Sequence, residues 1–143
     1  MPTSPEPQLL LLDTHVWVWL EAGSNELSAG ARRTISTALG AGLLRVAAIS
    51  LWELALLASR GRLVLGKPTN LWLDLALADP GPIIEPLNVH VAVESCHLPG
   101  AFHRDPADRM IVATARVINA IVMTRDRRIL DYAAHGHIKA VPA

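Results

Sequence analysis

The chain has 143 residues, which is the length of one ordinary domain and excludes a second hydrophobic core. Thirteen basic side chains balance thirteen acidic ones, so no net charge draws the chain to nucleic acid or to a membrane surface. Hydrophobic residues make up 51% of the chain, which excludes disorder and suggests a surface that is buried against a partner.

No segment of the sequence has the pattern of a targeting signal or a membrane span. Residues 1–7 hold three prolines and no cation, unlike a secretory signal, so we expect a flexible tail. The apolar run 46–58 is interrupted by Glu53 and is too short to cross a bilayer. Cys96 is the single cysteine, which excludes a disulfide framework, and we expect it to be a buried, inert thiol. These features predict a soluble, cytoplasmic protein.

Short apolar runs predict buried strands, and apolar residues at helical spacing predict helices between them. In the first half of the chain we expect strands at residues 8–12 and 43–49, and helices at 14–21, 27–39 and 51–59. In the second half we expect helices at residues 70–78, 89–96, 106–117 and 127–134, an edge strand at 83–87, and strands at 121–124 and 138–141. This alternation predicts an α/β fold with a central, mostly parallel sheet covered by helices on both faces.

Four acidic residues fall where the carboxyl ends of parallel strands are expected to meet. Asp13 directly follows the first strand, and Asp126 follows the strand 121–124 after one residue. Glu53 and Asp108 each lie in the predicted first turn of a helix beside these strands. Because ligands of open parallel sheets bind at this edge, the four carboxylates are candidates for a common site.

The same positions also suit helix caps. Ser50-Leu51-Trp52-Glu53 is a capping box in sequence, and Asp105-Pro106-Ala107-Asp108 is similar to one. Asp13 and Asp126 would equally cap the helices that follow them. The spacing alone therefore leaves open whether these acids form a site or a set of capped helices.

The surroundings of Asp13 favour a site. It lies between the apolar runs 9–12 and 16–19, so its carboxylate is expected to be poorly solvated and to need a partner. Several carboxylates brought together raise one another's pKa unless a cation neutralises them. Mg²⁺ binds one or two carboxylates together with waters and phosphate, and Mn²⁺ accepts the same oxygen ligands. We therefore weigh a metal-dependent phosphoryl site against the capping interpretation.

Four short strings identify a family resemblance: LLLDTHVWVW around Asp13, ISLWELALL around Glu53, HRDPADRMIVATA around Asp108, and VMTRDRRI around Asp126. In this order and at these separations they resemble the PIN-domain family, and most of all the VapC-type toxins of bacterial toxin–antitoxin pairs. The similarity runs from about Leu9 to the end of the chain. It implies one PIN-like nuclease domain at residues 8–143, a three-layer sandwich.

The resemblance also implies an activity and its residues. Relatives of this kind bind Mg²⁺ or Mn²⁺ in an acidic pocket and cleave single-stranded or looped RNA, leaving a 3′ hydroxyl and a 5′ phosphate. The family's catalytic and metal-binding acids map to Asp13, Glu53, Asp108 and Asp126. Accessory positions that are common in the family map to Asp105 and Thr124. Homodimers and a small antitoxin partner are implied as well.

Two positions depart from the related sequences. Relatives with the same HRDP string usually carry an aromatic residue where Ala107 stands, and often a glutamine where Thr114 stands. Neither position is one of the four acids. We therefore expect these departures to bear on substrate choice and local packing, and not on catalysis.

The basic residues are skewed towards the last third of the chain. Five arginines flank the acids in sequence and are candidates for binding RNA phosphates: Arg104, Arg109, Arg125, Arg127 and Arg128. Each could instead lie on a solvated helix face or pair with a neighbouring aspartate.

Two other functions are open from the sequence. The same acidic pocket would serve a metal-dependent nuclease acting on DNA flaps or ends. Alternatively, Asp13 would accept a phosphoryl group in a non-enzymatic regulatory domain. Such domains use a lysine near the last strands, and the lysines of this chain are Lys67 and Lys139.

Overall fold

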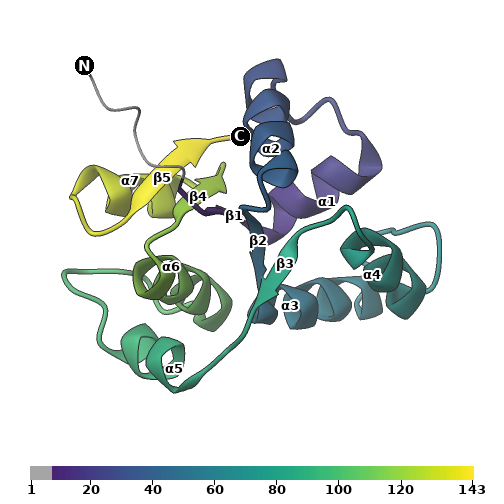
Figure 1. Ribbon diagram of the computed structural model, residues 1–143. Helices are drawn as coiled ribbons and strands as arrows, with labels where there is room; N and C mark the ends of the chain where they lie inside the picture. Colours follow the sequence, from purple (N-terminus) through teal and green to yellow (C-terminus); the bar gives the residue numbers. More distant parts are fainter. Residues whose placement is uncertain (1–7) are drawn as a thin grey trace, which may run out of the picture.

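The computed structural model describes residues 8–143 and contains a five-stranded parallel sheet between two layers of helices (Figure 1). The strand order is β3-β2-β1-β4-β5. The strands are β1 (Leu10–Leu12), β2 (Leu44–Ala47), β3 (Ile83–Glu85), β4 (Ile121–Thr124) and β5 (Lys139–Pro142). The helices are α1 (Thr14–Ala22), α2 (Ala29–Gly40), α3 (Ala48–Ser59), α4 (Thr69–Leu77), α5 (Val89–Cys96), α6 (Pro106–Ile118) and α7 (Arg127–Ala134).

The central strand β1 is buried on both faces, as its unbroken leucine run predicts. Leu10 and Leu12 belong to one core, whereas Leu11 between them belongs to the other. The first core contains residues of α1 to α4, and the second contains residues of α5, α6 and α7. Figure 1 shows these two groups of helices on opposite sides of the sheet. The predicted three-layer α/β fold is confirmed.

Most predicted elements agree with the structure to within one or two residues, but the junction of β2 and α3 is different. The strand ends at Ala47 and the helix begins at once at Ala48, with Ala47 as a cap residue that makes no side-chain hydrogen bond. Ser50 is therefore the third residue of α3, and its buried hydroxyl accepts a hydrogen bond from the hydroxyl of Thr14. The predicted capping box at Ser50 is wrong, because no loop separates the strand from the helix. Glu53 consequently lies in the second turn.

Two further expectations concern single segments. Cys96 is exposed at the end of α5, which corrects the prediction of a buried thiol. The predicted tail at residues 1–7 lies outside the described residues. Within residues 8–143, no helix has both the length and the apolar character needed to cross a membrane.

Helix α6 packs in the second core against one face of the sheet and carries Asp108, so its packing determines where this acid lies. Ile111 is fully buried in the second core, whereas Val117 on the same helix is 39% exposed. We expect Ile111→Ala to lower the free energy of unfolding by about 3 kcal/mol, because it leaves a cavity against the sheet. Val117→Ala should change it by less than about 0.5 kcal/mol. Urea denaturation followed by circular dichroism measures both, and equal costs would contradict this packing.

Candidate functional site

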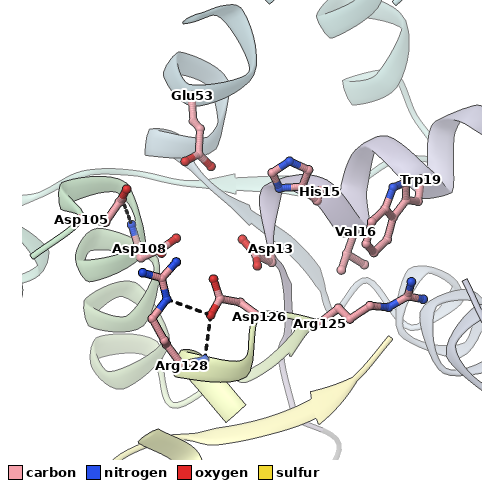
Figure 2. Close-up of a pocket in the computed structure, with 10 residues that line it drawn as sticks. All are labelled: Asp13, His15, Val16, Trp19, Glu53, Asp105, Asp108, Arg125, Asp126 and Arg128. Atoms are coloured by element: carbon pink, nitrogen blue, oxygen red, sulfur yellow. Dashed lines mark hydrogen bonds and ion pairs between the residues drawn. The ribbon is translucent and has the colours of Figure 1, made fainter. Parts of the chain in front are cut away.

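A cleft of about 410 Å³ lies at the carboxyl edge of the sheet, and half of the residues that line it are acidic (Figure 2). The acidic residues are Asp13, Glu53, Asp105, Asp108 and Asp126. They come from the end of β1, from α3, from the start of α6 and from the start of α7. Figure 2 shows their side chains directed towards one another around a common space. The structure therefore brings together all four acids selected from the sequence, with Asp105 as a fifth.

Asp13 is the most buried of these acids, with 7% of its surface exposed. One carboxylate oxygen accepts a hydrogen bond from the backbone N–H of Thr14 at 2.8 Å, and the other accepts one from the hydroxyl of Thr124 at 2.7 Å. Burial raises the pKa of Asp13, and the hydrogen bonds from Thr124 and Thr14 partly oppose this effect. The carboxylate is thus fixed in direction but costly to ionise.

Glu53 faces Asp13 from the neighbouring helix α3. Burial raises the pKa of Glu53, and the charges of Asp13 and Asp105 raise it further, whereas the nearby Thr14 side chain lowers it. The Thr14 hydroxyl donates to Ser50 Oγ at 2.8 Å, one turn of α3 before Glu53. Thr14 and Ser50 therefore join α1 to α3 beneath two of the acids.

Asp105 and Asp108 lie together at the start of α6. Asp105 caps the helix, since its Oδ1 accepts a hydrogen bond from the N–H of Asp108 at 3.0 Å. Carboxylate oxygens of Glu53, Asp105 and Asp108 lie within 4.8 Å of one another. Burial, followed by the charge of Asp13 and of the other acids, raises the pKa of Asp108 to about 7. The negative charges of the other four acids of the cleft therefore all disfavour ionisation of Asp108.

Thr124 connects the remaining acid to Asp13. Its hydroxyl donates to Asp13 and accepts a hydrogen bond from the N–H of Asp126 at 2.9 Å. Asp126 in turn caps α7 by accepting from the N–H of Arg128 at 2.8 Å. A single buried hydroxyl thus sets the spacing between the acids that follow β1 and β4.

The five candidate arginines lie in different environments. Arg125 and Arg128 line the cleft. Arg125 pairs with Glu26 at 2.6 Å and lies over the ring of Trp19, and Arg128 lies 3.6 Å from Asp126. Arg104 and Arg127 are exposed and do not line the cleft. Arg109 donates to the backbone carbonyls of residues 95, 102 and 103, so its guanidinium holds a loop in place.

Sequence reasoning did not find the α1 wall of the cleft or the partner of Arg125. His15, Val16 and Trp19 line the cleft, and Glu26 anchors Arg125 at its rim. The helical spacing of residues 15, 16 and 19 after Asp13 was the available signal, since it places them on the surface of α1 nearest the acid. The pairing of Arg125 with Glu26 joins residues 99 positions apart and had no local signal.

The two departures from related sequences lie within α6. Ala107 is 4% exposed, and the Thr114 hydroxyl donates to the backbone carbonyl of Met110 at 2.7 Å. Neither residue lines the cleft. Their direct effects are therefore on the packing of α6.

The possible metal ligands that line the cleft are five carboxylates and the imidazole of His15, and no lysine lies among the lining residues. Burial first, and then repulsion from neighbouring acids, raises the pKa values of Asp13, Glu53 and Asp108. Oxygen ligands of this kind suit a hard divalent cation, which would neutralise the cluster. The arrangement is able to hold such an ion next to an open cleft.

Comparison with solved structures identifies relatives of this fold. A chain of DNA-bound VapBC from Salmonella typhimurium matches with a TM-score of 0.67 and 16% identity, covering 95% of this chain and 98% of that one. VapBC2 from Rickettsia felis, bound to a fragment of promoter DNA, matches with a TM-score of 0.67 and 14% identity, covering 94% and 98%. FitAcB from Neisseria gonorrhoeae matches with a TM-score of 0.61 and 23% identity, covering 92% and 96%. At these identities the similarity is one of fold.

Comparison of sequences identifies the family. The PIN domain family matches residues 10–135, which include every acid of the cleft. The curated protein Ribonuclease VapC22 from Mycobacterium tuberculosis (strain ATCC 25618 / H37Rv) is 39% identical over 132 residues, which cover 92% of this chain and 95% of that protein. The chain therefore belongs to the PIN-domain family and, within it, to the VapC proteins.

Proposed function

We propose that residues 8–143 form one ribonuclease domain, that this ribonuclease is the toxin of a toxin–antitoxin pair, and that it hydrolyses single-stranded or looped RNA in the cytoplasm. The observation that carries this proposal is the convergence of Asp13, Glu53, Asp108 and Asp126 on one open cleft. The relative that is named a ribonuclease, at 39% identity, supports the choice of RNA as substrate.

The proposed cofactor is Mg²⁺ or Mn²⁺. The residues fit such an ion, because the carboxylates of Glu53, Asp105 and Asp108 offer oxygens within 4.8 Å of one another. In addition, burial and the neighbouring acids raise the pKa of Asp108 to about 7. Asp13 and Asp108 would hold the ion, and Glu53 and Asp126 would contact it directly or through water. A divalent cation in this position lowers the pKa of water for attack on a phosphodiester and offsets charge on the phosphate oxygens.

Thr124 and Asp105 hold these acids in place. Thr124 fixes Asp13 relative to Asp126, and Asp105 fixes the first turn of α6 below Asp108. Arg125 and Arg128 lie at the rim, where their charges would attract RNA phosphates. Exposed Arg104 and Arg127 would extend this contact along the RNA chain. Arg109 has no such role in the proposal, because three backbone carbonyls occupy its guanidinium.

A small antitoxin protein is the proposed partner, and a homodimer is the proposed assembly. The matched structures from Salmonella typhimurium and Rickettsia felis are VapBC complexes, which supports an antitoxin. Exposed apolar side chains are available for such contacts on α3, α4, β3 and α5: Trp52, Leu71, Leu75, Ile83, Ile84, Val89 and Val93.

The activity depends most directly on Asp13. We expect Asp13→Asn to reduce RNA hydrolysis by about 100-fold or more, equivalent to about 2.7 kcal/mol of transition-state stabilisation. Asparagine keeps an oxygen that accepts from Thr14, so the variant should fold. The rate is measured from cleavage of a fluorescent stem–loop RNA in Mg²⁺, in Mn²⁺ and in EDTA. EDTA should abolish cleavage by the wild type.

Asp131→Asn is the matched control, since Asp131 is an exposed aspartate of α7 that does not line the cleft. It should retain wild-type activity. Full activity of Asp13→Asn would refute the assignment of the site. Preferential cleavage of a DNA flap would instead favour the DNA nuclease, and stable phosphorylation of Asp13 without hydrolysis would favour the regulatory domain.

The acidic cluster should also reduce stability when no cation is present. Because the pKa of Asp108 is raised to about 7 in the folded state, the folded protein binds this proton more tightly than the unfolded chain. The associated stability is complete below about pH 4 and is lost as the pH rises through about 7. In EDTA at pH 8, Asp108→Asn should therefore be more stable than wild type by roughly 1–2 kcal/mol, after allowance for solvent screening.

Thermal denaturation followed by circular dichroism measures this effect. The melting temperature of Asp108→Asn should exceed that of the wild type by about 2–6 °C at pH 8, and the difference should vanish near pH 4. Saturating Mg²⁺ should stabilise the wild type more than the variant. A variant that is less stable than wild type at both pH values would contradict this electrostatic account.

A further inference from the structure

His103 lies beside the acidic cleft, in the loop before α6, and the chemistry proposed above does not use it. We propose that His103 is a positioning residue, which holds the carboxylate of Asp108 in the direction needed to bind a divalent cation. This inference rests on the proposed function. It concerns a residue that contacts the cation's ligand rather than the substrate.

The position of His103 is fixed by contacts to α6 itself. Arg109 of α6 donates hydrogen bonds to the carbonyl oxygens of Phe102 at 3.1 Å and of His103 at 3.2 Å. The rings of Phe102 and His103 pack with their centroids 4.5 Å apart, and Phe102 packs in turn against Tyr132 of α7. The loop therefore cannot move away from the first turn of α6 without breaking these contacts.

The hydrogen bonds of the ring determine which nitrogen carries the proton. The backbone N–H of Asp105 donates to Nδ1 of His103 at 3.4 Å, so Nδ1 presents a lone pair. In a neutral imidazole the hydrogen then resides on Nε2. His103 is thus an N–H donor through Nε2 alone.

This donor points into the acidic cluster. Nε2 of His103 lies 3.1 Å from Oδ2 of Asp108, it is inaccessible to water, and it has no hydrogen bond of normal geometry to any group. Within residues 8–143, no hydrogen bond is donated to the carboxylate of Asp108, which the ring of His103 approaches without one. A buried N–H without a partner is costly, and a small rotation of Asp108 would provide one. Each group therefore has the other within hydrogen-bonding distance.

The neutral character of His103 suits this position. A donor on Oδ2 leaves the other oxygen of Asp108 available to a cation, and it restrains a carboxylate that neighbouring acids repel. A lysine or arginine here would also donate, but its charge would compete with the cation for the cluster. Carboxylates that bind metals are commonly held by such hydrogen bonds, whose loss weakens metal affinity about 10–100-fold.

The test is the affinity for Mn²⁺, measured from the electron paramagnetic resonance signal of the free ion. His103→Leu removes the donor and should weaken Mn²⁺ binding about 10-fold or more. His103→Gln restores a neutral N–H donor and should recover a large part of the affinity. His135→Gln, which changes an exposed histidine at the end of α7, should bind Mn²⁺ as the wild type does.

A second measurement needs no variant and therefore decides the question if His103→Leu does not fold. Nuclear magnetic resonance of ¹⁵N-histidine-labelled wild type should show His103 protonated at Nε2 and not at Nδ1. Addition of Mg²⁺ should shift the Nε2 resonance, because the contact with Asp108 changes. A proton on Nδ1, or a spectrum that Mg²⁺ leaves unchanged, would overturn the proposal.

The outcomes separate this inference from the proposed function. If the wild type binds Mn²⁺ and cleaves RNA while folded His103→Leu has the same Mn²⁺ affinity, the role of His103 is refuted and the ribonuclease assignment stands. If the wild type neither binds Mn²⁺ nor cleaves RNA, both are refuted.

Discussion

Mutual repulsion among carboxylates is the interaction on which the rest of this structure depends. Asp13 is nearly buried, and the pKa values of Asp13, Glu53 and Asp108 are all raised, first by burial and then by neighbouring acids. A fold that served stability alone would separate these groups or pair them with cations. Within residues 8–143, no arginine pairs with any of these three acids. Arg128 approaches only Asp126, at 3.6 Å, while Arg125 pairs with Glu26 and Arg109 binds backbone carbonyls. The cluster is therefore stable only at a cost that a bound divalent cation would offset.

Capping and site formation, which the sequence left as alternatives, are the same feature in this structure. Asp13, Asp105 and Asp126 each cap a helix, and each also lines the cleft. The backbone N–H groups and the partial positive charge at each helix start hold one carboxylate oxygen in place. The parallel sheet then places these helix starts at one edge. Local capping thus fixes the directions of the acids, and the topology brings them together.

The parts that sequence could predict are those with local causes. The leucine run of β1 ends at Asp13, and β4 ends shortly before Asp126, so the alternation of strands and helices placed both acids correctly. The parts that failed depend on contacts distant in sequence. Ser50 bonds Thr14 across 36 positions instead of capping α3. Cys96 is exposed because it ends a helix, α5, at the surface.

A divalent cation held between side chains from the end of β1 and from α3, α6 and α7 is the central claim. Anomalous diffraction from a crystal soaked in Mn²⁺ tests this most directly, because it locates the ion without reference to activity. The account predicts a peak within coordination distance of carboxylate oxygens of Asp13 and Asp108. A crystal at neutral pH with no anomalous peak in the cleft, or with Mn²⁺ bound only elsewhere, would contradict it.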